Sequence, residues 1–317
     1  MSQTSHPYKY LFGPVPSRRL GKSLGIDLIP FKTCTQNCLY CQLGVDAEQT
    51  VERKAYVSID EVLGELRQRI KDGLDADYIT ISGSGEPTLH SELGELIEQI
   101  RELTLIPIAV ITNGTLLMLP EVRRDCAKAD VVLPSLDAGE KQTFEKINKP
   151  HTDIKFEDFI EGLCKFRAEY SGKIWLEVFF CEGVNADTDS IELIRSQIEK
   201  IRPDRIQLNT AVRPTVHKEA AAVSSERLHE IAKQLDPEAE VIADFCKAES
   251  LPPKPVTCDD IVTTLKRRPC TLEDLVGSLG ITTEQAKKHL KHLLQQKKIN
   301  QENRIGKIYY TPGKIPH

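Results

Sequence analysis

Apolar strand-like runs and amphipathic helical runs alternate along most of this chain, from about residue 22 to residue 245. Strands that are apolar on both faces are typical of a parallel sheet covered by helices on both sides, so we expect an α/β fold. About six βα units fit a partial (β/α)6 TIM-like barrel better than a two-domain nucleotide-binding fold, although periodicity alone does not decide between them. The expected strands are 23–29, 76–82, 106–112, 130–136, 174–180 and 205–210, and the expected helices are 58–71, 92–103, 120–129, 154–169, 188–201 and 224–234.

The pattern changes at residues 247–256, where three prolines interrupt the periodicity and indicate a linker. Beyond it, residues 257–317 contain three helical segments, the second of which ends at Gly280, a residue suited to a helix C-terminus. A two-stranded ribbon that turns near residues 303–306 follows them. This order predicts a C-terminal winged helix-turn-helix domain. We therefore expect a barrel domain with an N-terminal extension over 1–246, a linker over 247–256 and a winged-helix domain over 257–317.

Composition excludes several classes of protein. Hydrophobic residues make up 40% of the 317 positions and charged residues 28%, as in a globular protein rather than a disordered one. No run approaches the roughly 18 apolar residues that a membrane-spanning helix needs, and the N-terminus lacks the apolar core of a signal peptide. We therefore expect a cytoplasmic protein with no membrane partner. The net charge of −5 is unevenly spread, because residues 257–317 carry +5 and the rest of the chain −10.

Three of the nine cysteines are clustered. The segment FKTCTQNCLYC places Cys34, Cys38 and Cys41 at CxxxCxxC spacing in a loop after the first expected strand. Thiolates bind iron–sulfur clusters, and three of them leave one iron of a four-iron cluster open for another ligand, such as S-adenosylmethionine. Structural zinc usually takes four protein ligands, and no Cys or His in the next twenty residues supplies a fourth. The other alternative is that the three cysteines are buried and chemically inert. Their position in a polar loop does not favour that alternative.

With Tyr40 directly before the third cysteine, the triad resembles the defining motif of the radical S-adenosylmethionine (radical SAM) superfamily. The resemblance covers about residues 20–245, which in that superfamily form a partial (β/α)6 barrel. It implies two cofactors, a 4Fe-4S cluster and S-adenosylmethionine. It also implies a one-electron donor of flavodoxin or ferredoxin type. The implied chemistry is reductive cleavage of S-adenosylmethionine to methionine and a 5′-deoxyadenosyl radical, which abstracts hydrogen from a substrate.

A glycine-rich loop follows the next strand, in ITISGSGEPTLH. It resembles the Gly-Gly-Glu motif of the superfamily, with Ser84 in place of the first glycine, and the resemblance implies that it holds the amino group of S-adenosylmethionine. Polar residues at later strand ends are implied to contact the ribose and carboxylate. The alternatives are a tight βα turn and helix capping. The candidate cofactor contacts are Tyr40, Ser84, Gly85, Glu86, Asn113, Ser135 and Asp137, and the candidate metal ligands are Cys34, Cys38 and Cys41.

Further polar residues are candidates for substrate binding. Glu177 lies within an apolar strand, where burial is costly, so we expect it to face the barrel lumen or to pair with a cation. Arginine can hold an anionic group through its fork of donors. The candidate substrate contacts are Arg18, Arg19, Gln207, Asn209 and Arg213.

The segments LFGPVPSRRLGKSLGIDL, GSGEPTLH and QLNTAVRP resemble a branch of the superfamily related to the wyosine-tRNA synthetases. Those enzymes bind a second cluster through cysteines that precede the triad. No cysteine precedes Cys34, so we expect this chain to lack the second cluster. Packing is the expected role of the remaining cysteines, with Cys181 and Cys246 as positions to check for chemistry. These cysteines are 126, 164, 181, 246, 258 and 270.

The basic C-terminal module suits contacts with a phosphate backbone through Lys287, Lys288, Lys291 and Arg304. A solvated lysine face on a module that binds protein is the alternative. The leading hypothesis is therefore a radical SAM enzyme with one cluster, acting on tRNA or another nucleic acid. Two hypotheses remain beside it: an iron–sulfur, redox-sensing DNA-binding regulator, and a radical SAM enzyme that acts on a peptide or small molecule.

Overall fold

The computed structural model describes residues 8–43, 47–212, 215, 217, 219–243, 256–267, 269–304 and 306–313. Its main element is one nine-stranded sheet in the order β1-β2-β5-β6-β7-β8-β9-β11, in which β10 pairs with β8. Strands β2, β5, β6, β7, β8, β9 and β11 are parallel, whereas β1 and β10 are antiparallel to their partners. The strands are β1 (Leu11–Ser17), β2 (Gly21–Asp27), β5 (Tyr78–Ser82), β6 (Ile108–Thr112), β7 (Val131–Pro134), β8 (Lys173–Glu182), β9 (Arg205–Thr210), β10 (Ala221–Ala222) and β11 (Glu240–Val241).

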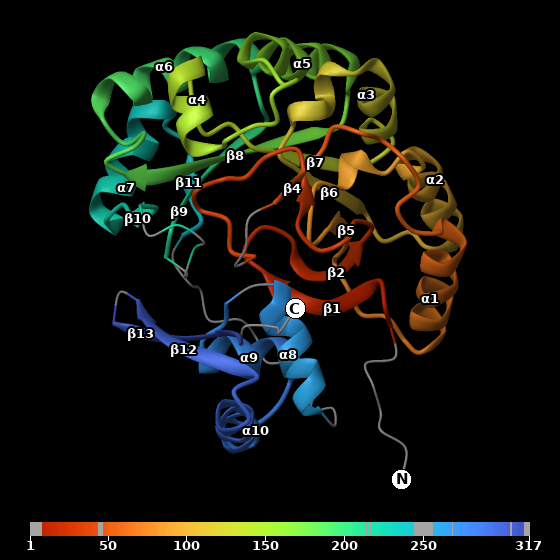
Figure 1. Cartoon of the computed structure of the whole chain (residues 1–317). Helices are drawn as coiled ribbons and strands as arrows, with labels where there is room; N and C mark the ends of the chain where they lie inside the picture. The colour runs from red at the N-terminus through yellow and green to blue at the C-terminus, as the bar shows by residue number, and fades with distance from the viewer. Residues whose placement is uncertain are drawn as a thin grey trace.

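Helices cover the outside of this curved sheet (Figure 1). Each presents an apolar stripe to the strands, as in α6, where Ile191, Ile194, Ile198 and Ile201 are buried at helical spacing. The α/β fold with six successive βα units is therefore confirmed, and it is consistent with a partial TIM-like barrel. The helices are α1 (Ile59–Lys71), α2 (Leu93–Leu103), α3 (Pro120–Cys126), α4 (Lys141–Ile147), α5 (Phe156–Glu169), α6 (Thr188–Ile201) and α7 (Ser225–Leu235), with the short 3-10 helices η1 (Pro87–Leu89) and η2 (Thr115–Met118).

The inner face of the sheet carries a cluster of buried apolar side chains. Side chains alternate between the two faces of a strand, so every second residue points inward. Leu20, Ala109, Val131, Leu133 and Trp175 pack into one buried cluster. This cluster fills the part of the interior nearer the N-terminal ends of the strands. The C-terminal ends, where the cysteine loop and the glycine-rich loop leave the sheet, are therefore the side at which a site can form.

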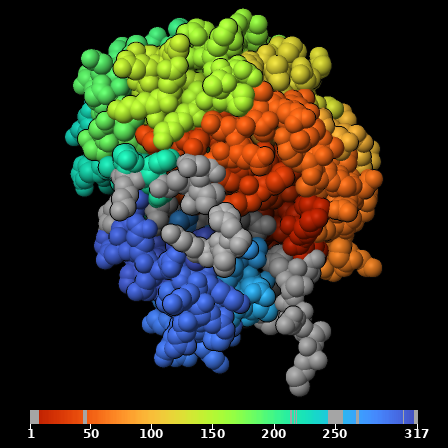
Figure 2. Space-filling model, viewed as in Figure 1, coloured from red at the N-terminus to blue at the C-terminus, as the bar shows by residue number. Residues whose placement is uncertain are grey.

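The C-terminal module is a separate lobe with its own core (Figure 2). Its elements follow the predicted order: α8 (Cys258–Arg267), α9 (Leu272–Leu279), α10 (Thr283–Gln295), β12 (Ile299–Arg304) and β13 (Lys307–Pro312). Helices α9 and α10 each begin with a capping box, at Thr271 and Thr282. Gly280 ends α9 in the left-handed conformation, as expected. Most of the predicted linker lies outside the described residues, and the winged-helix identity of this module stays a prediction.

Within the ranges that the structure describes, no helix is both long enough and apolar enough to cross a membrane.

Candidate functional site

The three clustered cysteines lie in the loop between β2 and α1, at the C-terminal side of the sheet. Cys34 is part of a short parallel pair formed by β3 (Thr33–Cys34) and β4 (Glu48–Gln49), and all three thiols are half-buried. Burial, together with the nearby Glu86 and Cys41, raises the pKa of Cys34 to about 12. Burial also raises the pKa of Cys38 well above its ordinary value, with added contributions from Asp137, Cys34 and Cys41. Cys34, Cys38 and Cys41, which we call the cysteine nest, are thus close enough for one thiol to shift the pKa of another. A metal that binds there must displace their protons.

Each of the three sulfurs has its own hydrogen-bond donor. The amide of Asn113 lies 3.6 Å from the sulfur of Cys34, and the amide of Asn148 lies 3.6 Å from the sulfur of Cys38. The ammonium group of Lys32 donates to the sulfur of Cys41 at 2.7 Å. These donors come from the end of β6, the end of α4 and the cysteine loop itself. Such donors orient metal-bound thiolates and stabilise their negative charge.

The thiol ligands of this site are of the type that iron–sulfur clusters use. Among the described residues, no group of three or more His, Cys, Asp or Glu side chains is arranged around one metal ion. In a cubane each thiolate binds a different iron, so the sulfurs stay farther apart than the ligands of one ion. Three thiols, each with its own hydrogen-bond donor, are ligands of the kind that an iron–sulfur cluster uses.

The glycine-rich loop packs directly on the cysteine loop. The backbone N–H of Lys32 donates to the carbonyl of Ser84 at 2.6 Å, and that of Glu86 donates to the carbonyl of Thr33 at 3.1 Å. A Cβ atom on Gly85 would lie 2.1 Å from the same Thr33 oxygen, so only glycine fits there. The two loops are therefore held together by their backbones.

Ser84, the departure from the expected glycine, has a structural reason. Its hydroxyl donates to Asp27 at 2.6 Å, and its backbone N–H donates to the same carboxylate at 3.1 Å. Asp27 is the last residue of β2. Ser84 thus fixes the glycine-rich loop to the strand from which the cysteine loop begins.

Glu86 points into the protein. Its buried carboxylate accepts hydrogen bonds from the N–H and hydroxyl of Thr88, the hydroxyl of Thr112 and the N–H of Asn113, at 2.6–3.0 Å. Burial raises the pKa of Glu86, although these donors lower it in part. Four internal donors occupy the carboxylate in this structure, and a contact between Glu86 and the cofactor stays a prediction. Its role is to join the glycine-rich loop to the end of β6.

Asp137 is also turned inward, beneath the cysteine loop. It accepts hydrogen bonds from the hydroxyl of Tyr40, from the amide of Asn148 at 2.6 Å and from the N–H of Phe179 at 2.9 Å. Burial raises the pKa of Asp137 to about 6. Asp137 is not the cap of the following helix α4, whose N-cap is Glu140, and its contact with the cofactor stays a prediction. Asp137 instead holds the residues that support the third cysteine and Cys38.

The other candidate contacts lie at the mouth of the nest. The ring of Tyr40 stacks on that of Phe179, with centroids 3.8 Å apart. Asn113 donates to Thr35 of the cysteine loop at 2.7 Å. Ser135 is half-buried at the end of β7, where its backbone pairs with that of Glu177. Of these residues, Asn113 contacts the cysteine loop directly, as do Ser84 and Gly85 of the glycine-rich loop.

A comparison with known families identifies this constellation. The family model described as "Radical SAM superfamily" matches residues 28–194, a range that holds the three cysteines and the glycine-rich loop. This chain belongs to the radical SAM superfamily. Members of the superfamily use a 4Fe-4S cluster and S-adenosylmethionine as cofactors.

Curated relatives of this radical SAM protein extend the match. It is 35% identical over 296 residues to a "UPF0026 protein" of Helicobacter pylori (strain J99), which covers 91% of the chain and 93% of that protein. It is 39% identical over 309 residues to a protein named "GTPase Obg" of Brachyspira hyodysenteriae, which covers 96% of the chain. The chain spans 45% of the length of that Brachyspira protein.

Solved structures agree on the fold. The radical SAM methyltransferase from Sphaerobacter thermophilus superposes with a TM-score of 0.52 at 16% identity, over 69% of this chain and 65% of that one. This likeness supports the partial barrel and says nothing of the substrate. The predicted relation to the wyosine-tRNA synthetases stays a prediction.

A nearly buried ion pair joins the turn between β1 and β2 to β8. Arg19 contacts Glu177 at 2.5 Å, and Asn209 donates to the same carboxylate at 2.9 Å. Burial would raise the pKa of Glu177, but Arg19, Asn209 and Arg18 outweigh it and the pKa is lowered. The expectation that Glu177 pairs with a cation is confirmed.

The remaining substrate candidates do not join this group. Arg18 donates to the carbonyl of Ile242, just after β11, and so spans the two edge strands of the sheet. Gln207 is buried and donates to Glu240 at 3.3 Å. Arg213 lies outside the described residues. Contacts of Arg18 and Gln207 with a substrate stay predictions.

The basic residues of the C-terminal module divide into two sets. Lys287, Lys288 and Lys291 are exposed on α10, which lies on the side of the module away from the barrel (Figure 1). Arg304 instead donates to Thr215 at 3.1 Å and to the carbonyl of Ala220 at 2.6 Å. In this structure the guanidinium group of Arg304 attaches β12 to the barrel, and its contact with nucleic acid stays a prediction.

The other cysteines follow the expected packing role. Cys126, Cys181 and Cys270 are buried, and Cys164 and Cys258 are half-buried. Cys246 lies outside the described residues. Burial raises the pKa of Cys181 to about 12, so its thiol keeps its proton at neutral pH.

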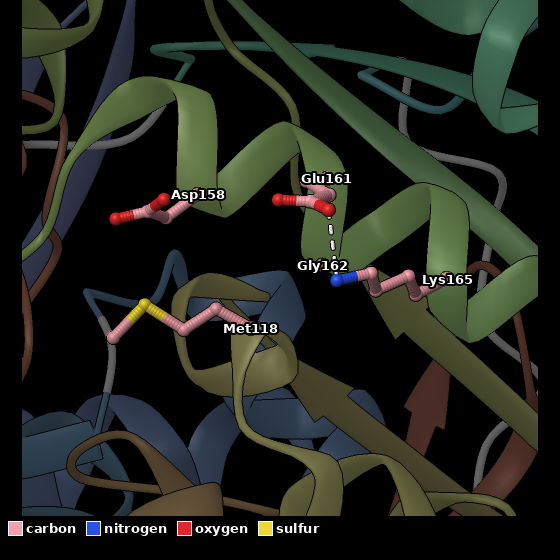
Figure 3. A pocket seen from close by; sticks show the side chains of 5 residues that line it. All are labelled: Met118, Asp158, Glu161, Gly162 and Lys165. Atoms are coloured by element: carbon pink, nitrogen blue, oxygen red, sulfur yellow. Dashed lines mark ion pairs between the residues drawn. The ribbon is translucent and has the colours of Figure 1, made fainter.

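A hollow on the outer surface is a weaker candidate for a functional site than the cysteine nest. It has a volume of about 240 Å³, and Glu161 and Lys165 of α5 form an ion pair at 2.8 Å beside it (Figure 3). Small-molecule sites are usually larger and more apolar, at roughly 300–1,000 Å³. Its lining residues are Met118, Asp158, Glu161, Gly162 and Lys165.

Four side chains of the site were not predicted from the sequence: Asp27, Lys32, Asn148 and Phe179. Lys32 was the one with a local signal, because it lies two residues before the first cysteine. Asn148 and Phe179 reach the nest from distant segments, whereas Asp27 lies at the end of β2, seven residues before Cys34. Nothing in the immediate sequence marks these three residues.

Proposed function

We propose that this radical SAM enzyme binds one 4Fe-4S cluster at Cys34, Cys38 and Cys41 and acts on a nucleic acid, with tRNA as the first candidate. When bound, the cluster and S-adenosylmethionine supply one electron and a 5′-deoxyadenosyl radical that abstracts hydrogen from the substrate. The protein holds the three sulfurs and gives each a donor. The glycine-rich loop and Tyr40 would hold S-adenosylmethionine beside them, and Glu86 and Asp137 keep these loops in position.

The observation that carries the nucleic-acid assignment is the lysine face of α10. Lys287, Lys288 and Lys291 are exposed, and no carboxylate among the described residues forms an ion pair with them. The charge of this module is +5, whereas the rest of the chain is acidic. Unpaired exposed lysines on one helix suit a phosphate backbone, which releases counterions when it binds.

The attachment of the module to the barrel supports the same assignment. Helix α9 packs against β1, and Arg304 fastens the ribbon to Thr215 and Ala220. Thr215 and Ala220 follow the C-terminal end of β9, which is the side on which the cysteine nest lies. A nucleic acid bound by the module would thus be held by a domain that is attached to the barrel with the cysteine nest.

The enzyme assignment is tested by anaerobic reconstitution with iron and sulfide, reduction with dithionite and chromatography of 5′-deoxyadenosine. We expect the wild type to form it and Cys38→Ala to form none. Cys164→Ala, a half-buried cysteine of α5, is the matched control and should behave as the wild type. A wild type that binds iron but forms no 5′-deoxyadenosine would favour the iron–sulfur regulator.

The substrate assignment is tested in the same assay with added tRNA, duplex DNA or a peptide mixture. A bound substrate orients the reaction and excludes water, so the true class should raise the rate of 5′-deoxyadenosine formation. We expect tRNA to do so more than the others. Stimulation by peptide alone would contradict the nucleic-acid proposal and leave the enzyme assignment intact.

A further inference from the structure

Lys32 is a buried cation beside the cysteine nest. It is 4% exposed, and its ammonium group donates to the sulfur of Cys41 at 2.7 Å. Its charge also acts on Cys34 and lowers the pKa of that thiol in part. No carboxylate in the described ranges forms an ion pair with it. A buried ammonium group is costly without an anion, and the thiolates of a loaded nest are the anions in reach.

The backbone of Lys32 is held in a conformation that favours glycine. Its φ is 64°, in the left-handed region. Its N–H donates to Ser84 at 2.6 Å, and its carbonyl accepts from the N–H of Glu48 at 3.0 Å. The glycine-rich loop and β4 thus hold the residue from both sides. A lysine at a position that suits glycine indicates that its side chain has a function there.

Lys32 is also the charged member of the three sulfur donors. Asn113 and Asn148 offer neutral amides to Cys34 and Cys38. One-electron reduction takes a cluster from the 2+ to the 1+ state and adds one negative charge, while the donor is oxidised by one electron. A fixed cation nearby stabilises the reduced state more than the oxidised one, and a buried position strengthens the effect.

We propose that Lys32 raises the reduction potential of the cluster by placing its charge against the sulfur of Cys41. This inference rests on the proposed cluster site and adds a tuning residue to it. Lys32 is a positioning residue in this role, because it acts through Cys41. A higher potential lets a weaker one-electron donor reduce the cluster.

The test is a redox titration of the reconstituted protein without S-adenosylmethionine, followed by electron paramagnetic resonance of the reduced cluster. Lys32→Gly and Lys32→Asn remove the charge while the new residue tolerates the left-handed backbone. We expect both to lower the equilibrium constant for reduction about ten-fold, which is about 59 mV for one electron. Lys32→Arg keeps the charge and should stay nearer to the wild type.

Lys297→Gly is the matched control. Lys297 has a φ of 56°, is exposed and follows α10, far along the chain from the cysteines, so its loss should leave the potential unchanged. Wild-type potentials in Lys32→Gly and Lys32→Asn would overturn the proposal, as would equal shifts in Lys32→Arg. Loss of iron from the two uncharged variants but not from Lys32→Arg supports the charge pairing, and loss from all three overturns it.

Failure of the proposed function has a different signature. A wild type that holds no 4Fe-4S cluster or cleaves no S-adenosylmethionine contradicts the enzyme assignment. A wild type that does both, with variants of unchanged potential, contradicts the role of Lys32 alone.

Discussion

Gly85 meets the carbonyl oxygen of Thr33 so closely that a Cβ atom on the glycine would lie 2.1 Å from that oxygen. The same oxygen accepts the N–H of Glu86 at 3.1 Å. The loop implied to hold S-adenosylmethionine therefore touches the cysteine loop backbone to backbone. This backbone contact sets the distance between the glycine-rich loop and the cysteine loop.

Replacement of Gly85 by Ala should force the two loops apart. The Cβ would also lie 2.6 Å from a methyl group of Ile29, so the added carbon has no free space. We expect a loss of about 1–3 kcal/mol in the free energy of unfolding and a fall in iron content after reconstitution. Urea denaturation and iron analysis measure the two effects.

Gly64→Ala serves as the control for this substitution. A Cβ on Gly64 meets no atom within 4 Å, and the residue lies inside α1. Alanine should stabilise that helix by up to about 1 kcal/mol and leave iron content unchanged. An equal loss of iron in both variants would contradict the role of the Gly85 contact.

Most of the fold could be predicted from the sequence, because strands buried on both faces and amphipathic helices leave strong periodic patterns. The predicted strand 205–210 and helix 188–201 agree with β9 and α6. The strand β1 was not predicted, since Pro14 and Pro16 indicate only an extended segment, and an edge position tolerates them in a strand. Helix α4 has seven residues, too few to show a helical period.

The site could be predicted only where its chemistry is local. Cys34, Cys38 and Cys41 stand close together in the sequence. The inward orientation of Glu86 and Asp137 could not be predicted, because their partners are set by packing between distant strands. Asn148 is an example: it reaches Cys38 from 110 residues along the chain.

The ion pair between Arg19 and Glu177 should contribute more than its counterparts on the surface. Both side chains are nearly buried, at 15% and 16% exposed. Glu177→Gln leaves Arg19 buried without its anion and should cost about 3–5 kcal/mol in the free energy of unfolding. The double variant Arg19→Met, Glu177→Leu should recover much of that loss, because it removes both charges.

Glu192→Gln provides the comparison. Glu192 contacts Arg195 at the same distance of 2.5 Å, but the two side chains are 64% and 41% exposed. Its loss should cost less than about 1 kcal/mol, because water screens the pair. Chemical denaturation measures all three variants, and similar losses for Glu177→Gln and Glu192→Gln would show that burial adds nothing.

His90 should make the protein less stable as the pH falls below about 6.5. Burial lowers the pKa of His90, and Arg53 contributes. Its Nε2 lies 2.9 Å from the carbonyl of Val57, and its Nδ1 accepts from the N–H of Glu92, which suits the neutral ring. Below its ordinary pKa the unfolded chain binds a proton that the folded chain does not, so stability falls with the pH. The slope for one proton is at most about 1.4 kcal/mol per pH unit.

His90→Gln removes this titration, so the variant should show a flatter pH dependence of its unfolding free energy between pH 5 and about 7. His229→Gln, on the exposed face of α7, is the control and should keep the slope of the wild type. An unchanged slope in His90→Gln would assign the acid sensitivity to other groups.

The lysine face of α10 should supply a salt-dependent part of nucleic-acid binding. Replacement of Lys287, Lys288 and Lys291 by Gln should weaken binding of duplex DNA and of tRNA, as measured by fluorescence anisotropy. Each phosphate contact contributes roughly 0.7–0.9 to the slope of log K against log salt concentration, so loss of three contacts should reduce the slope by about 2–3. Substitution of Arg304 should leave the slope unchanged, because its guanidinium group binds the barrel.

A triple change of exposed lysines on the barrel helices separates this face from general charge. Lys141, Lys165 and Lys233 lie on α4, α5 and α7, and their replacement by Gln removes the same total charge. If binding depends only on net charge, both triple variants will lose affinity and salt dependence equally, and the assignment to α10 fails. A loss confined to the α10 variant locates the phosphate contacts on that helix, because the two proteins then differ only in where three positive charges were removed.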